Sequence, residues 1–234
     1  MDSFIVFAKE PAPGKVKTRL TPPLEPVEAV ALYTAFVQDV CGTIAAVAQE
    51  GDRKVLAAPG GAGTELASIA REHGFETVEQ VGADLGARMA KAIGDELARN
   101  SRAVVLVGSD SPTMPSESVR EAVRRLHSTT HGAVIGPAGD GGYWLVGAAG
   151  EVPDLFEDVA WSTRDVLSQT LARAKAVGID LALLPFWYDV DDIADVKLLD
   201  AHIAWGGGQG RTWAPRTSAA IARLKAARGG IFPA

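Results

Sequence analysis

Cationic side chains gather directly after the first apolar run of the chain, which spans residues 4–8. The segment that follows, residues 9–20, contains Lys9, Lys15, Lys17 and Arg19. Pro11, Pro13 and Gly14 keep this segment from forming a helix. Backbone amides and cations that follow a buried strand are a common way for α/β proteins to hold phosphate. The segment therefore predicts a phosphate-binding loop, and a solvated lysine-rich loop is the alternative.

A carboxylate follows the most continuous buried-strand pattern of the chain, residues 104–107. Asp110 comes directly after that run, where hard cations are held beside phosphates, and magnesium typically takes one or two carboxylates there. Asp110 or Ser111 would alternatively cap the next helix. Ser116 lies directly before the helical pattern and is the better cap, so we assign Asp110 to a metal.

Three more carboxylates lie close together in the sequence, at Asp189, Asp191 and Asp192. Such a cluster is costly without a cation or hydrogen-bond donors. Asp192 is placed to cap the following helix. Asp189 and Asp191 alternate along an extended segment and so share one face, which predicts that one of them supplies a second metal ligand. A solvated, acidic helix start is the alternative.

Two further segments are candidates for ligand contact. Asp140, Gly141, Gly142 and Tyr143 form a strong turn signal, yet their loop is longer than a tight hairpin needs. Glycine there would also let a ligand approach the backbone, so a hairpin turn and an acceptor or sugar site are compatible. Arg88, at a predicted helix start, is either a ligand contact or a surface residue.

Strand and helix patterns alternate along the chain and set where these loops lie. Apolar runs predict strands at residues 3–9, 54–58, 77–78, 104–107, 133–136, 143–147 and 180–184. Helical periodicity covers residues 26–48, 65–73, 86–99, 163–177, 192–204 and 215–227, with a helix from 116. This order predicts a single-domain α/β protein with a mostly parallel sheet and helices on both faces. The loops named above should meet at the carboxyl edge of that sheet.

Composition limits the kinds of partner. The 234 residues carry a net charge of −6, which argues against a nucleic-acid partner and makes the cationic segment a site for a small anion. We find no apolar run long enough to span a bilayer, so we predict no membrane attachment and a cytoplasmic location. The lone cysteine, Cys41, lies among apolar residues at helical spacing and is predicted to be a core residue.

Four segments together resemble a known family. They are residues 7–20, 108–112, 140–147 and 189–191. The combination resembles the bacterial group DUF2064, placed in the glycosyltransferase-A (nucleotide-diphospho-sugar transferase) superfamily, whose fold is Rossmann-like. Residues 17–20 and 110–112 are more distantly similar to motifs of the molybdenum-cofactor and 2-phospholactate guanylyltransferases. The resemblance runs over residues 3–204. The usual glycine-rich first loop is replaced here by proline and lysine, and the usual two-aspartate metal motif has one carboxylate, Asp110.

The resemblance implies roles for the candidate residues. The first loop would hold nucleotide phosphates, through Lys9, Gly14, Lys15, Lys17 and Arg19, with Arg88 added. Asp110 would bind Mg²⁺ or Mn²⁺ with Asp189 or Asp191. Catalysis would rest on Lys17, Arg19 and Asp110, and the acceptor or sugar would face Asp140, Gly141, Gly142 and Tyr143.

The leading hypothesis is a metal-dependent nucleotidyltransferase that joins a nucleoside triphosphate to a small phosphorylated acceptor. The alternatives are a glycosyltransferase that uses a nucleotide-sugar donor, and a nucleotide-binding protein without turnover. We expect the transferase domain to span residues 1–204. Residues 205–234 should form a Gly-rich link and a C-terminal helix on the same domain. The oligomeric state is open, with a homodimer among the options.

Overall fold

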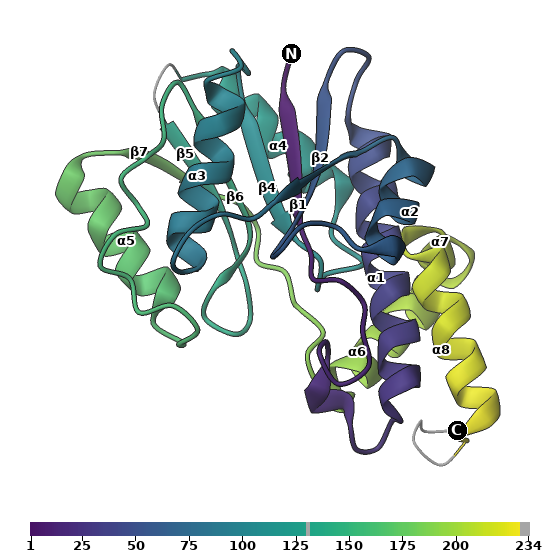
Figure 1. The fold of residues 1–234 in the computed structure, drawn as a ribbon. Helices are drawn as coiled ribbons and strands as arrows, with labels where there is room; N and C mark the ends of the chain where they lie inside the picture. Colours follow the sequence, from purple (N-terminus) through teal and green to yellow (C-terminus); the bar gives the residue numbers. More distant parts are fainter. Residues whose placement is uncertain (130–131, 230–234) are drawn as a thin grey trace.

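A seven-stranded sheet forms the centre of the molecule (Figure 1). The computed structural model describes residues 1–129 and 132–229. The strand order is β3-β2-β1-β4-β6-β5-β7, and β6 runs antiparallel to both of its neighbours while the other pairs are parallel. The strands are β1 (Ser3–Phe7), β2 (Arg53–Ala58), β3 (Glu76–Glu79), β4 (Val104–Gly108), β5 (Gly132–Pro137), β6 (Tyr143–Ala149) and β7 (Asp180–Leu183). The predicted mostly parallel α/β sheet is confirmed.

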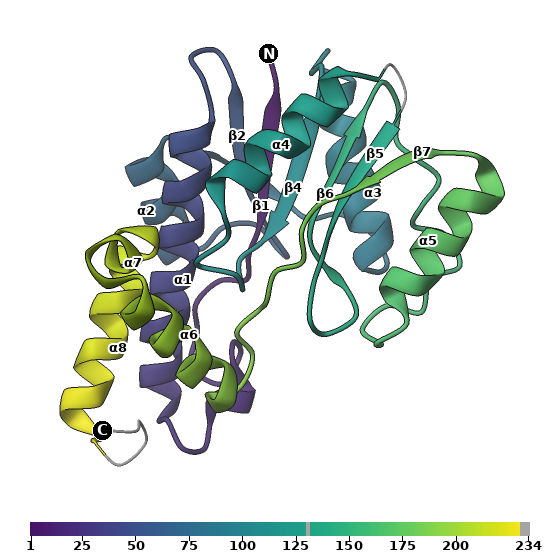
Figure 2. The ribbon, with the colours of Figure 1, turned by 180° about the vertical axis from the view of Figure 1, so that it is seen from behind.

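Helices cover both faces of the sheet, as Figures 1 and 2 show from opposite sides. Side chains of α1, α2, α4, α6 and α8 share one buried cluster, and those of α3 and α5 share the other. The helices are α1 (Pro26–Val47), α2 (Thr64–His73), α3 (Leu85–Leu97), α4 (Ser116–His127), α5 (Val166–Val177), α6 (Ile193–Trp205), α7 (Gly207–Trp213) and α8 (Pro215–Ala227), with a 3₁₀ turn η1 (Thr18–Leu20). Every predicted helix is present, with ends that move by up to three residues.

Strand β1 shows how the sheet divides the core. Phe4 and Val6 belong to the cluster under α1 and α4, while Ile5 and Phe7 belong to the cluster under α3. All four side chains are buried because a central parallel strand has helices on both faces. This two-sided burial explains why such strands appear in the sequence as continuous apolar runs.

Helix α1 corrects one expectation from the sequence. It has 22 residues, and an 18-residue window within it reaches a mean hydropathy of 1.5, so its length and composition would allow it to cross a membrane. It packs instead against β1, α2, α4 and α8, and buries Leu32, Phe36 and Val40 completely. Cys41 lies on the same buried side, and burial raises the pKa of its thiol to about 12. A thiol without access to solvent and without ionisation near neutral pH is a core residue, as predicted.

The C-terminal segment is more regular than its glycines suggest. Gly207–Trp213 form helix α7 where the sequence predicts a loose link. A Cβ atom on Gly210 would lie 2.1 Å from the carbonyl oxygen of Ile203, so the glycine is needed for close packing against the end of α6. Helix α8 then packs along α1, and the buried Asp39 of α1 accepts hydrogen bonds from the amides of Arg216 and Thr217 at the start of α8.

One predicted helix cap and one predicted helix start are wrong. Ser116 is the first helical residue of α4 and not its cap, because the chain is extended at Pro115. The hydroxyl of Ser116 instead accepts a hydrogen bond from Arg120. Helix α5 begins at Val166, later than predicted, because Thr163 bonds back to the carbonyl of Ala160 in a preceding turn. The predicted cap at Asp192 is confirmed, since its carboxylate accepts from the amides at the start of α6.

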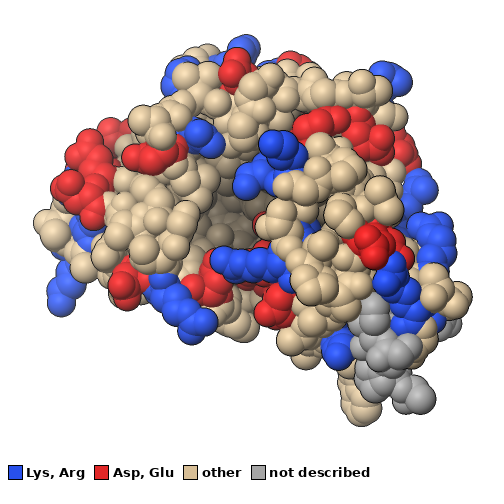
Figure 3. All heavy atoms as spheres, turned by 60° about the horizontal axis from the view of Figure 1, so that its bottom comes forward, with Lys and Arg blue, Asp and Glu red and all other residues tan. Residues whose placement is uncertain are grey.

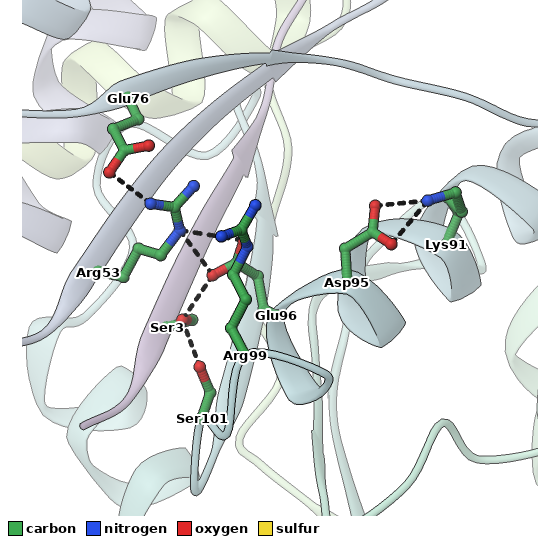
Figure 4. Close-up of polar contacts among 8 residues, drawn as sticks. All are labelled: Ser3, Arg53, Glu76, Lys91, Asp95, Glu96, Arg99 and Ser101. Carbon is green, nitrogen blue, oxygen red and sulfur yellow. Dashed lines mark hydrogen bonds and ion pairs between the residues drawn. The ribbon is translucent and has the colours of Figure 1, made fainter.

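A polar network with a buried centre and exposed outer members holds the edge of the sheet where the parallel strands begin (Figure 4). Its members are Ser3, Arg53, Glu76, Glu96, Arg99 and Ser101. The carboxylate of Glu96 is buried and accepts from the Ser3 hydroxyl at 2.8 Å and from Arg53 Nε at 2.9 Å. The network ties the end of α3 to the starts of β1 and β2, so this edge of the sheet is built for stability.

Glu96→Gln should lower the free energy of unfolding by about 3 kcal/mol, because Arg53 loses the buried member of its two carboxylate partners and keeps only the exposed Glu76. Asp95→Asn is the matched control, since Asp95 forms an exposed pair with Lys91 one turn away (Figure 4). That change should cost no more than about 0.5 kcal/mol. Denaturant unfolding of both variants measures the difference, and equal losses would contradict the role assigned to Glu96.

Candidate nucleotide and metal site

The loops at the carboxyl edge of the sheet enclose one large cleft. Its volume is about 1080 Å³. Figure 3 shows the hollow from this edge, with Lys and Arg side chains on its rim and acidic side chains beside them. The candidate residues that line it are Lys9, Lys15, Lys17, Arg19, Arg88, Asp110, Asp140, Gly142, Tyr143 and Asp191. The loops after β1, β4, β5 and β7 therefore meet, as the sequence predicts.

Lys17 lies at the centre of the charged residues. Its ammonium is 2.6 Å from Asp110 Oδ1 and 2.8 Å from Asp191 Oδ1. The Lys17 side chain is only 5% exposed, and its Nζ lies 6.0 Å from the centre of the Phe36 ring. Burial lowers the pKa of Lys17, but the attraction of Asp110 and Asp191 outweighs it, so the pKa is raised above its usual 10.5. Lys17 is therefore a buried, charged bridge between two loops.

The carboxylates around Lys17 come from separate strands. Asp110 follows β4, and Asp191 follows β7 by way of an extended segment. The amide of Val190 donates to the carbonyl oxygen of Asp110 at 2.9 Å, which joins the two loops through their backbones. The side chains of Asp110 and Asp191 remain 45% and 37% exposed, so both present oxygen atoms to the cleft as well as to Lys17.

Tyr33 of α1 holds the first loop against the loop after β4. Its hydroxyl accepts from the amide of Lys9 at 2.9 Å and lies 3.1 Å from Ser109 Oγ. Burial, with the negative charge of Asp110, raises the pKa of Tyr33 to about 12, so it stays a neutral hydroxyl. Glu10 fixes the other side of the loop by accepting from amides at the start of α2. The first loop is thus held in place by Tyr33 and Glu10, which are not among the candidate residues predicted from the sequence.

Asp189 behaves differently from Asp191. Its Oδ1 atom is buried without a hydrogen-bond partner, and Asp189 does not line the cleft. Burial raises the pKa of Asp189 to about 7, and the carboxylates of Asp140, Asp191 and Asp110 add to the shift. Of the two carboxylates, Asp191 lines the cleft and Asp189 does not, and which of them binds a metal stays a prediction.

The glycines after β5 are required by the backbone conformation and close packing of their turn. Gly141 has φ of +91°, and a Cβ atom there would lie 2.2 Å from the carbonyl oxygen of Arg164. The close neighbour is therefore the chain before α5 and not a ligand, and Gly141 does not line the cleft. Asp140 Oδ1 accepts from the amide of Gly142 at 2.7 Å, which closes the turn. Asp140, Gly142 and Tyr143 do line the cleft. Their role in binding an acceptor or a sugar stays a prediction.

The opposite wall combines cationic and aromatic side chains. Arg88 lies near the start of α3 and donates to the carbonyl oxygen of Gly82 at 3.2 Å. Arg164 and Trp161 line the cleft from the segment before α5. The Trp161 ring meets the Tyr143 ring edge-on, with 6.4 Å between ring centres. The sequence offered no distinguishing signal for Arg164.

Gly14 has a structural role in the first loop. It lies at φ +72° and is not among the residues that line the cleft. Its place in the turn explains why glycine stands there, since this backbone conformation disfavours a side chain. A direct contact between Gly14 and phosphate stays a prediction.

The oxygen atoms of Asp110 and Asp191 suit a hard divalent cation in chemistry. Among residues 1–129 and 132–229, no three His, Cys, Asp or Glu side chains are grouped so that they could hold a metal ion. Two carboxylates suffice for magnesium, however, because water and phosphate oxygens complete its coordination. The residues therefore fit Mg²⁺ or Mn²⁺, on condition that the Lys17 ammonium leaves the space between them.

Solved structures with the same fold are nucleotide-dependent transferases by their descriptions. A Desulfovibrio desulfuricans G20 protein, provisionally described as a nucleotide-diphospho-sugar transferase, is 29% identical, with a TM-score of 0.85 and full coverage of both chains. Glucosyl-3-phosphoglycerate synthase from Mycobacterium tuberculosis, in complex with Mn²⁺ and UDP, is 13% identical with a TM-score of 0.52, covering 100% of this chain and 81% of its own. A Leptospira borgpetersenii cytidylyltransferase is 12% identical with a TM-score of 0.54, covering 99% and 97%. The last two likenesses concern the fold.

The fold is thus the glycosyltransferase-A type of the nucleotide-diphospho-sugar transferases. Residues 43–163, about half of the chain, match the family described as "Uncharacterized protein conserved in bacteria (DUF2064)". The chain belongs to this family, which confirms the resemblance found in the sequence. No curated protein matches it.

Tyr33→Phe should lower the free energy of unfolding by about 1–2 kcal/mol, because the amide of Lys9 loses its acceptor in a partly buried place. Ser109→Ala is the matched control, since the Tyr33 hydroxyl still accepts from Lys9 in that variant. Denaturant unfolding should therefore show a smaller loss for Ser109→Ala, and a loss equal to that of Tyr33→Phe would contradict the bridging role of the hydroxyl.

Proposed function

We propose that the protein is a nucleotidyltransferase that joins the α-phosphate of a nucleoside triphosphate to a small phosphorylated acceptor. One observation carries the proposal: the cations of the first loop and the carboxylates after β4 and β7 line the same cleft. In this reaction an acceptor oxygen forms a bond to the α-phosphorus, and pyrophosphate leaves. Catalysis then needs positioning and charge neutralisation more than covalent participation by the protein.

The cationic residues supply the neutralisation. Lys9, Lys15 and Arg19 are exposed at the cleft, and Arg19 is 78% exposed with its Nη1 3.8 Å from Asp191. Their side chains are free to turn toward phosphate oxygens, and the arginine fork binds two oxygens at once. A triphosphate carries more negative charge than a diphosphate sugar, so this surplus of cations favours the triphosphate donor.

Asp110 and Asp191 are the carboxylates we assign to the metal, because both line the cleft whereas Asp189 does not. A divalent ion bound there would withdraw charge from phosphate oxygens. Asp189 instead keeps a proton to near neutral pH and limits the negative charge of the group.

The acceptor is assigned to the wall formed by Arg164, Tyr143 and Trp161. Arg164 fits an acceptor that carries its own phosphate or carboxylate, and Arg88 on the same wall stays assigned to the nucleotide. Asp140 lies on the same side of the cleft and would accept a hydrogen bond from an acceptor hydroxyl. The aromatic pair closes the cleft against α3, because a Cβ atom on Gly86 would meet the Trp161 ring at 2.5 Å.

Glycosyl transfer from a nucleotide sugar is the second candidate. It is favoured by the full-length likeness to the Desulfovibrio protein, whose provisional description is that of a nucleotide-diphospho-sugar transferase. The same cations and carboxylates would hold a diphosphate, and the sugar would face Asp140 and Tyr143. A nucleotide-binding protein without turnover is the third reading, and cytoplasmic location and oligomeric state stay predictions.

Incubation with α-³²P-labelled nucleoside triphosphates, Mn²⁺ and a panel of phosphorylated hydroxy acids tests the lead. Transfer of label to the acceptor with release of pyrophosphate is expected. Asp110→Ala should reduce the rate about 100-fold or more, as for loss of a group that stabilises transition-state charge, whereas Asp95→Ala should not. Release of nucleoside diphosphate from nucleotide sugars, without label transfer, would establish glycosyl transfer instead.

Arg19→Ala should weaken binding of the triphosphate about tenfold and leave the corresponding nucleoside unaffected, because the arginine contacts phosphate alone. Arg99→Ala is the control, since Arg99 is also an exposed arginine with one long ion pair, at the opposite edge of the sheet. Isothermal titration measures both ligands. Equal losses for nucleoside and triphosphate would contradict a phosphate contact.

A further inference from the structure

The ammonium of Lys17 occupies the space that a metal shared by Asp110 and Asp191 would need. It contacts Oδ1 of both carboxylates, at 2.6 and 2.8 Å. A divalent cation bridging the same oxygens would lie within a few ångströms of the ammonium, and like charges that close repel strongly where water is scarce. Lys17 and a metal therefore exclude each other at this position.

Lys17 differs from the other cations of the first loop. Lys9 and Lys15 are exposed, and no ion pair joins either of them to any residue the structure describes. Lys17 is buried, and among the described residues its charge is balanced by the two carboxylates and by the face of the Phe36 ring. It leaves them only if another anion takes over that balance.

We propose that Lys17 is the resident counter-ion of the metal site. It excludes divalent cations from the nucleotide-free protein, and it is drawn away by polyphosphate oxygens when the nucleotide brings its own cation. The inference rests on the proposed function for the identity of the polyphosphate. Its regulatory consequence is that metal and nucleotide enter together, so the free protein does not collect metal in advance.

The energetics of the exchange support the proposal. Asp110 and Asp191 keep 45% and 37% of their side chains exposed toward the cleft, so an incoming cation can reach oxygens of both. Phosphate oxygens provide Lys17 with partners as strong as the carboxylates it leaves. Metal ions alone provide no such partner, and displacement of Lys17 would then leave a buried ammonium without compensation.

Equilibrium dialysis against Mn²⁺ without nucleotide tests the exclusion directly. Lys17→Met should bind Mn²⁺ roughly tenfold more tightly than the wild type, or better, because the competing charge is gone. Lys17→Gln serves as a second variant, which keeps polar contacts to both carboxylates if Lys17→Met fails to fold. Lys15→Met is the matched control from the same loop and should bind Mn²⁺ as the wild type does. Addition of Asp110→Ala to Lys17→Met should abolish the gain. Equal Mn²⁺ affinity in the wild type and both Lys17 variants overturns the proposal.

A second dialysis against Mn²⁺ adds ³²P-labelled GTP, CTP, UTP or ATP in separate cells. Bound nucleotide and bound Mn²⁺ are each measured as the excess on the protein side of the membrane, so that complexes free in solution are not counted. The wild type should retain both together. Nucleotide retained without Mn²⁺ overturns the displacement of Lys17 while leaving nucleotide binding intact. If no triphosphate is retained, the proposed function fails, and the metal-only comparison still decides whether Lys17 excludes the metal.

Discussion

A buried ammonium has to be neutralised within a few ångströms, and the site is arranged around this constraint. Lys17 receives its compensation from Asp110 and Asp191, which reach it from two different strands. Its Nζ also lies 6.0 Å from the centre of the Phe36 ring on α1. The same helix supplies Tyr33, whose hydroxyl joins the loop of Lys17 to the loop of Asp110. Loss of the pairing would leave the buried ammonium without compensation, so the loops are held together by their charges as well as by their backbones.

The two edges of the sheet have different roles: one stabilises the fold, and the other forms the cleft. At the edge where the strands begin, the Glu96 carboxylate is enclosed and fully bonded by Ser3 and Arg53, with little room for a ligand. At the carboxyl edge, the charged groups are bonded on one side and open to a cleft on the other. A parallel sheet allows this division because all strand ends of one kind meet on one side. Polar residues are buried at both edges. Among the described residues, it is at the carboxyl edge that charged groups keep atoms open to a ligand.

Much of this arrangement could be predicted from the sequence, and the failures have physical causes. Buried parallel strands appear as short apolar runs, so the sheet and the meeting of its loops followed directly. The position of Asp189 outside the cleft could not be predicted. Alternation along an extended chain indicates on which side of the chain a residue lies, but not whether that side faces solvent or protein. Gly141 was ambiguous for a similar reason: its positive φ serves contact with Arg164, far along the sequence. Tyr33 lies within the predicted helix of residues 26–48, and its hydroxyl contacts could not be predicted because they depend on tertiary packing.

The most consequential difference concerns charge. In the sequence, the first loop is a positive segment in an acidic protein, which suggests that it attracts a bare anion. In the structure, Lys17 is surrounded by two carboxylates, and Asp140 and Asp189 lie close enough to affect one another electrostatically. The floor of the cleft is therefore negative on balance, while the rim carries the exposed Lys9, Lys15 and Arg19. A polyphosphate is attracted by the cations at the rim and repelled by the carboxylates at the floor. A divalent cation that accompanies the polyphosphate turns this repulsion into attraction. This distribution supports the proposal that a metal–nucleotide complex binds in preference to either component alone, and the support is the same for nucleotidyl and glycosyl transfer.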